Sequence, residues 1–148
     1  MAGDAVRRNA WTIANIVMLL AFAFSVVVQV NDPDPWSWIL IYAAALMICA
    51  AELGRRTRPA SAAIVGLAAL AWAATIAPRA IGRVRFLDMF EEFEMRGVGI
   101  EESREMYGLL IIALWMAAVA VAAWRRRRAA TRTSLQGAER PQHHGGVS

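Results

Sequence analysis

The sequence predicts an all-α fold, a polytopic membrane four-helix bundle with a short amphipathic helix in its outer loop. Hydrophobic residues make up 58% of the 148 residues and charged residues only 19%, whereas soluble domains carry about 45–50% apolar and about 25% charged residues. The apolar residues gather in four blocks of about 18–21 residues, each long enough to cross a hydrocarbon core of about 30 Å. All basic residues are arginines, and many of them flank these blocks.

The first block predicts a helix over about residues 10–30, after a short N-terminus of residues 1–9. Arg7 and Arg8 precede it, but its apolar run is longer than a signal-peptide core and no small-residue cleavage site follows. We therefore expect a retained membrane helix. Trp11 is expected to anchor it at the interface, and Asn15, deeper in the block, to make an interhelical hydrogen bond.

The second block predicts a helix over about residues 36–53. Asp34 suits the N-cap and Pro35 the first helical position, while Trp36 and Trp38 are expected in the interfacial aromatic belt. Gly54 is expected to end the helix.

Glu52, near the end of this second block, precedes Arg55 and Arg56 by three and four positions. This spacing predicts a local ion pair at the membrane interface rather than a proton relay.

The third block, about residues 60–77, is rich in alanine and contains Gly66. Small residues let helix backbones approach closely in lipid, so this helix is predicted to lie centrally in the bundle. The fourth block predicts a helix over about residues 102–124, which completes a transmembrane domain of residues 10–128.

Two segments flank the fourth block. Aromatic and methionine residues recur at helical spacing among acidic ones over about residues 84–96, which predicts an amphipathic helix on the membrane surface or across the bundle mouth. Residues 129–148 are polar and show no apolar period, so we expect a disordered tail.

The arginines predict the topology. Four crossings place eleven arginines and three acidic residues on one side, and five arginines and nine acidic residues on the other. The positive-inside rule then puts both termini in the cytoplasm, and we expect the protein in the cell inner (plasma) membrane. Four arginines directly after a membrane helix are typical of lipid-headgroup contact, so a nucleic-acid partner is not expected.

Two polar clusters meet on the predicted outer face. One is the sequence Q-V-N-D-P-D-P-W at residues 29–36; the other follows Glu101 into the fourth helix. On that helix, positions 101, 104, 105 and 108 share one face, and Gly108 would let another backbone approach. The candidate residues of this outer-face cluster are Asn31, Asp32, Asp34, Glu101, Glu102, Arg104 and Glu105; Gly66 and Gly108 are candidate helix-packing residues.

These motifs carry a family resemblance. N-D-P-D after an apolar helix, followed about 70 residues later by E-x-R-E-x-x-G-L, resembles the transmembrane protein 220 family. The resemblance covers about residues 13–124. It implies a small four-helix membrane protein, and it brings no substrate, cofactor or catalytic residue with it.

Two interpretations of the outer-face cluster remain open. In the structural one, Asp34 caps a helix and Arg104 pairs with Asp32 or Asp34. In the other, the carboxylates form a site for a hard cation or a small solute. The first implies a non-enzymatic scaffold or accessory protein; the second, a cation- or small-solute-binding protein or transporter.

Further sequence features bear on cofactors and partners. Cys49 is the single cysteine, and His143 and His144 lie in the tail, so no disulfide, cysteine zinc cluster or bis-histidine haem is expected. We therefore predict no catalytic residue, metal or cofactor. The bilayer is the expected partner, together with a second copy or another membrane protein.

Overall fold

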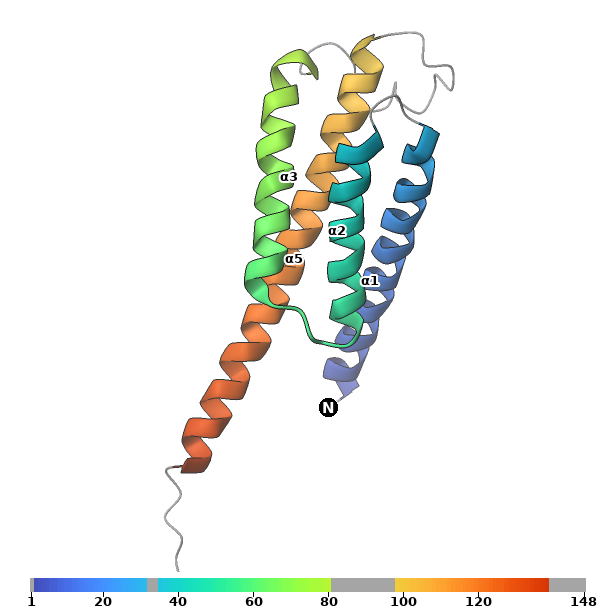
Figure 1. Ribbon diagram of the computed structural model, residues 1–148. Coiled ribbons are helices and arrows are strands. Elements are labelled where there is room, and N and C mark those ends of the chain that lie inside the picture. Colours follow the sequence, from blue (N-terminus) through green and yellow to red (C-terminus); the bar gives the residue numbers. More distant parts are fainter. Residues whose placement is uncertain (1, 32–34, 81–97, 139–148) are drawn as a thin grey trace, which may run out of the picture.

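The computed structural model describes residues 2–31, 35–80 and 98–138 (Figure 1). Its elements are α1 (Ala2–Val28), the 3-10 turn η1 (Gln29–Asn31), α2 (Pro35–Leu53), α3 (Pro59–Ala80) and α5 (Val98–Ala138). Four of these helices are long and apolar enough to cross a membrane. The chain is a multi-pass, all-α membrane protein, which confirms the predicted fold class.

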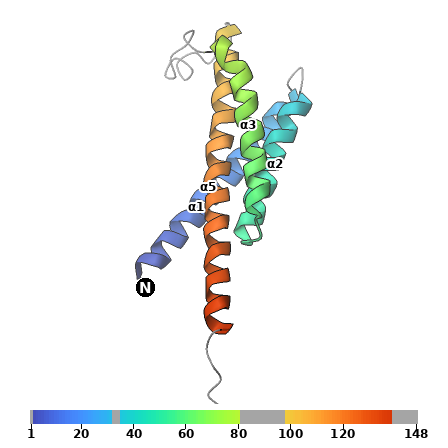
Figure 2. The same ribbon diagram turned by 90° about the vertical axis from the view of Figure 1, so that its left-hand side faces the viewer.

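The helices are arranged as two pairs. α3 packs along α5 over most of its length, and α1 packs along α2. α2 joins the pairs through shorter contacts with α3 and α5. Figure 2 shows α1 crossing α5 obliquely, so that the two helices diverge toward the N-terminus. The sequence predicts that the Ala-rich α3 lies centrally in the bundle. This prediction is wrong, because α3 lies on one side, against α5.

The core between α3 and α5 explains this pairing. α5 presents Leu109, Ile112, Met116 and Val119, all fully buried, at the three- and four-residue steps that keep side chains on one face of a helix. α3 meets them with small residues: Ala62, Gly66, Ala69 and Ala73. In lipid, such small residues bring helices together by close packing.

Aromatic side chains connect the two pairs. Trp38 on α2 stacks on Trp72 of α3, with ring centroids 4.5 Å apart. Tyr42, one turn further along α2, contacts both Trp38 and Phe22 of α1. Trp38 is 7% exposed, so it belongs to the core and not to the predicted aromatic belt.

The largest differences from the predicted helix boundaries are at the start of α1 and the end of α5. α1 begins at Ala2 instead of residue 10, and α5 continues to Ala138 instead of ending near residue 124. The predicted disorder is therefore wrong for residues 129–138. Adding residues to an existing helix gains one hydrogen bond each, and alanine, arginine and glutamine favour it.

Some predicted segments lie outside the described residues. These are the amphipathic helix at about 84–96 and the tail from 139 onward.

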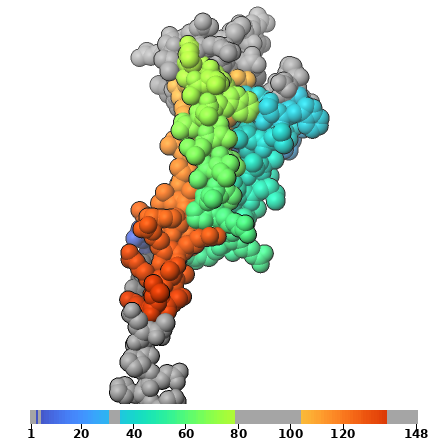
Figure 3. Space-filling view, turned by 60° about the vertical axis from the view of Figure 1, so that its left-hand side comes forward, coloured from blue at the N-terminus to red at the C-terminus, as the bar shows by residue number. Residues whose placement is uncertain are grey.

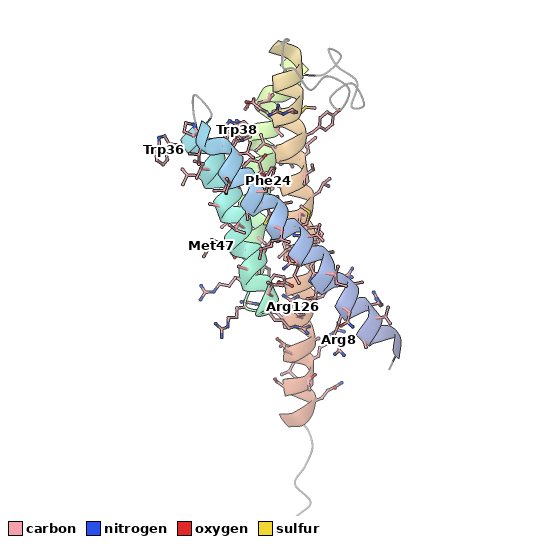
Figure 4. The ribbon with its side chains drawn as sticks, turned by 90° about the vertical axis from the view of Figure 1, so that its right-hand side faces the viewer. Arg8, Phe24, Trp36, Trp38, Met47 and Arg126 are labelled. Atoms are coloured by element: carbon pink, nitrogen blue, oxygen red, sulfur yellow. The ribbon has the colours of Figure 1, made fainter. Side chains whose placement is uncertain are left out.

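The lateral surface is largely apolar. Phe24, Trp36 and Met47 are each about 70% exposed and point away from the bundle (Figure 4). Such a surface is stable against lipid tails but not in water. In the space-filling view, α5 continues alone past the start of α3 (Figure 3).

Candidate functional site

The two ends of the bundle carry the polar residues. The end where α1 begins, α2 ends, α3 begins and α5 continues outward is called the Arg-rich end; the other, where η1 leads into α2 and α5 begins, is the opposite end (Figure 1).

The predicted outer-face cluster falls at the opposite end, where the structure describes only part of it. Asp32 and Asp34 lie outside the described residues, as does the proposed pairing of either with Arg104. The backbone of Asn31 is in η1, and Glu101 and Glu102 are in the first turns of α5. Arg104 and Glu105 follow on α5, with Arg104 exposed and Glu105 half-buried.

Gly108 accommodates a side chain rather than the backbone that the sequence suggests. A Cβ atom added at residue 108 would lie 2.6 Å from the hydroxyl oxygen of Tyr42, closer than a carbon atom approaches a non-bonded oxygen. Glycine thus lets Tyr42 of α2 lie directly against α5, one turn from Arg104.

Gly66 does bring two helices together. A Cβ at residue 66 would lie 3.1 Å from Cβ of Met116 and 3.4 Å from the carbonyl oxygen of Ala113. Both atoms belong to α5, so this position sets the spacing between α3 and α5.

Metal-binding geometry is not found in the part of the chain that the structure describes. There, no group of three or more His, Cys, Asp or Glu side chains could hold a metal ion. Most of the predicted carboxylate ligands have no described side chain, so this finding does not test the cation site.

The Arg-rich end contains a buried ion pair of Glu52, but its partner differs from the predicted one. Glu52 on α2 pairs with Arg126 on α5 rather than with Arg55 or Arg56. Nη1 and Nη2 of Arg126 donate to Oε1 and Oε2 of Glu52 at 2.6 and 2.7 Å. Both carboxylate oxygens are thus occupied in the parallel, bidentate geometry that makes arginine–carboxylate pairs strong.

The turn after α2 explains why the nearby arginines are not the partners. Arg55 has a φ of 54°, and its N–H donates to the carbonyl of Glu52, while Arg56 N–H donates to the carbonyl of Ala51. These bonds form a Schellman-type end to the helix. Here Arg55, and not Gly54, takes the left-handed conformation.

Trp11 adds α1 to this contact. Its indole N–H donates to Oε1 of Glu52 at 3.1 Å, and its ring stacks on Trp115 of α5, with centroids 5.3 Å apart. Trp11 therefore packs within the bundle and is not the expected interfacial anchor. We call Trp11, Glu52 and Arg126 the three-helix clasp, because each comes from a different helix.

One turn deeper, Asn15 makes the predicted interhelical hydrogen bond. Its Nδ2 donates to the carbonyl oxygen of Cys49 at 2.8 Å. Asn15 is 1% exposed, so this bond satisfies its amide nitrogen at membrane depth, while its Oδ1 has no hydrogen-bond partner among the described residues.

Beside the three-helix clasp, α1 and α5 enclose a cleft of about 830 Å³. We call it the arginine cleft, since its mouth is lined by Arg7 and Arg8 of α1, Arg55 of the turn after α2, and Arg125 and Arg126 of α5. Figure 4 shows Arg8 and Arg126 on the two helices that form its sides. The sequence placed these arginines on one side of the membrane but did not show that they share a cleft.

Comparison with known proteins places the chain in a family. The family model described as "Transmembrane family 220, helix" matches residues 21–121. No solved structure matches the chain. The matched segment runs from α1 through α2 and α3 to the buried part of α5, and it contains both motifs on which the resemblance rests. The chain belongs to transmembrane family 220.

Proposed function

We propose that this protein is a non-enzymatic membrane scaffold or accessory protein that presents the exposed basic end of α5, residues 127–136, to a partner. The observation that best supports this proposal is the three-helix clasp. Its buried carboxylate accepts hydrogen bonds from Arg126 and Trp11, and so both of its oxygens are used to join three helices. This use of the ionisable group supports a structural role, because ionisable groups within membrane segments are otherwise prime candidates for transport or proton transfer.

The helix α5 continues beyond the clasp. Residues 127–136 continue the helix beyond Arg126 and are all exposed. They contain Arg127, Arg128 and Arg132 and no acidic residue, and Arg128 lies over the ring of Trp124 at 3.9 Å. We call residues 127–136 the basic arm. Its charge suits an acidic surface on another membrane-associated protein.

The charge asymmetry supports a location for the arm. With both termini on the Arg-rich side, the positive-inside rule favours the cytoplasmic face of the inner membrane. A cysteine at exposed position 134 tests this orientation. In Ser134→Cys, the new cysteine should not react with an impermeant thiol reagent in intact cells and should react after permeabilisation. Labelling in intact cells would show that the topology is the opposite one.

Photo-crosslinking in the native membrane tests the role of the arm. A photoreactive amino acid replaces Leu135 on the arm or, as a control, the lipid-facing Leu67 on α3; these side chains are 62% and 65% exposed. We expect a discrete protein adduct from position 135 alone, which weakens when the three arm arginines become glutamate. Equal protein labelling from both positions, or none from position 135, would contradict the proposal.

A transport role makes a different prediction. Purified protein in sealed vesicles should not carry ions or solutes down an imposed gradient. Saturable uptake that Glu52→Gln abolishes would contradict the scaffold role in favour of a transporter.

A further inference from the structure

We propose that the arginine cleft holds one anionic phospholipid, with its phosphate among the arginines and an acyl chain against the wall of α5. This site is separate from the basic arm, and it does not depend on the arm having a protein partner.

Charge is the first argument. Five guanidinium groups and one carboxylate line the cleft. The carboxylate, Glu52, is already neutralised by its bidentate pair with Arg126. The other four arginines of the mouth are exposed, and their guanidinium N–H groups face solvent: Arg7, Arg8, Arg55 and Arg125. Arginine binds phosphate in the same planar, bidentate manner as carboxylate, so the cleft selects an anionic headgroup.

The depth of the cleft is the second argument. Below the arginines, its α5 wall consists of Ala117, Ala118, Val121 and Ala122. From residue 126 to residue 117 a helix rises about 13 Å, close to the roughly 15 Å that half of a hydrocarbon core occupies. The wall therefore spans one leaflet from headgroup to mid-membrane. A free phosphate would use the arginines but leave this apolar wall empty.

The shape of the two helices is the third argument. The stacked Trp11 and Trp115 bridge α1 and α5 close to Ala117, and from there α1 leaves α5 obliquely (Figure 2). The resulting volume, about 830 Å³, lies within the range of sites that bind small molecules. Arginines above an alanine-rich wall match a charged headgroup above an acyl chain, so a single lipid is the proposed occupant.

Arg55 adds a fourth observation. It occupies the left-handed conformation at the end of α2, which glycine would adopt without strain. Its side chain lines the cleft. Backbone strain of this kind persists where the side chain is needed, and here it adds a positive charge to the mouth.

Native mass spectrometry of the full chain in mild detergent tests the proposal. The lipids are phosphatidylglycerol and phosphatidylcholine with identical acyl chains, and glycerol 3-phosphate serves as the free-phosphate probe. The first variant, Arg7→Gln/Arg8→Gln/Arg125→Gln, removes three charges from the mouth. Its matched control, Arg127→Gln/Arg128→Gln/Arg132→Gln, removes three charges from the basic arm on the same side.

A second pair of variants tests the wall without changing charge. Ala118→Phe fills the cleft, whereas Ala74→Phe adds the same ring at an exposed position of α3. Melting temperatures of all variants without added lipid identify any that fail to fold.

We expect the wild type to retain one phosphatidylglycerol and to prefer it to phosphatidylcholine. Binding should weaken at least about tenfold in the mouth variant, given the attraction of each arginine for an anionic surface, and similarly in Ala118→Phe. Both controls should bind as the wild type does. Equal losses in the mouth and arm variants would overturn the proposal in favour of a diffuse charge effect. Equal retention of the two lipids, or glycerol 3-phosphate binding as tight as that of phosphatidylglycerol, would also overturn it.

Discussion

Glu52 and Arg126 form two parallel hydrogen bonds, 2.6 and 2.7 Å long, between residues 74 positions apart in the chain. The carboxylate side chain is 2% exposed and the arginine side chain 25%. A buried carboxylate that loses its cation is strongly destabilising, even though the intact pair contributes little compared with an apolar replacement. The pair therefore favours one relative position of the two helices, in which the end of α2 lies beside residue 126 of α5.

The first prediction concerns this pair. Arg126→Gln should lower the free energy of unfolding by about 3 kcal/mol, because Glu52 remains buried without its partner. Arg127→Gln, at the neighbouring exposed position, should change it by less than about 0.5 kcal/mol. Denaturant or thermal unfolding in detergent measures both.

A double-mutant cycle with Glu52→Gln isolates the interaction. We expect a coupling energy of about 1–3 kcal/mol between positions 52 and 126. Additive effects would show that the two side chains do not stabilise each other.

The second prediction concerns the contact of Tyr42 with Gly108. Gly108→Ala should cost about 1–3 kcal/mol, since the new methyl group would lie 2.6 Å from the tyrosine hydroxyl and Tyr42 is held by Trp38 and Phe22. Tyr42→Phe removes that oxygen and leaves the next ring atom 3.9 Å away. In the Tyr42→Phe background, Gly108→Ala should thus become neutral or gain up to about 1 kcal/mol from helix propensity.

Melting temperatures of the wild type, the two single variants and the double variant test whether the Tyr42 hydroxyl obstructs a methyl group at position 108. A Gly108→Ala loss of equal size in both backgrounds would show that the hydroxyl is not the obstacle.

The third prediction concerns the spacing of α3 and α5. Gly66→Ala should destabilise the protein by about 1 kcal/mol, because overpacking against the Met116 Cβ and the Ala113 carbonyl exceeds the gain in helix propensity. Gly3→Ala is the matched control. Nothing lies within 4 Å of its added Cβ, and it should be neutral or slightly stabilising. Unfolding experiments in detergent should rank the two variants in this order, and the reverse order would contradict the packing role of Gly66.

The fourth prediction concerns the turn after α2. Arg55→Gly should raise the free energy of unfolding by about 0.5–1 kcal/mol, since glycine relieves the left-handed conformation at φ 54°. Arg56→Gly should lower the free energy of unfolding. In the described ranges Arg55 is the non-glycine residue with positive φ, so glycine at position 56 relieves no strain and only adds flexibility to the unfolded chain. Lipid-free detergent is the proper condition for this comparison, as bound lipid would favour the arginine. A loss of stability in Arg55→Gly would show that the conformation carries no strain.

The fold was readable from the sequence for a simple physical reason. Crossing a bilayer requires about 20 consecutive apolar residues per helix, and this requirement is local in the chain. The starts of α2 and α3 were equally local, since they begin at Pro35 and Pro59 and proline favours the first helical position. The start of α1 and the end of α5 were not readable in this way. A helix continues beyond its apolar part wherever no residue stops it.

The candidate site was harder to predict. The outer-face cluster was chosen for its motifs, but Asp32 and Asp34 lie outside the described residues, and its role stays a prediction. The sequence does not reveal the partner of Glu52, because Arg55 and Arg56 lie at the local spacing for an ion pair, and the four consecutive arginines from Arg125 to Arg128 carry equivalent charges. Which of them points inward depends on the rotation of α5, and that is decided by its packing against α3.

The sequence by itself determined that this is a four-helix membrane protein, which helix ends carry the arginines, and that Asn15 needs a partner at depth. These properties follow from hydrophobic length and from the cost of an unpaired polar group in lipid. Only the tertiary structure decided which side chains meet. It paired Glu52 with Arg126, set Tyr42 against Gly108, and opened the arginine cleft between α1 and α5. Such contacts depend on the crossing and rotation of whole helices, which arise from the summed packing of many small residues rather than from any local pattern.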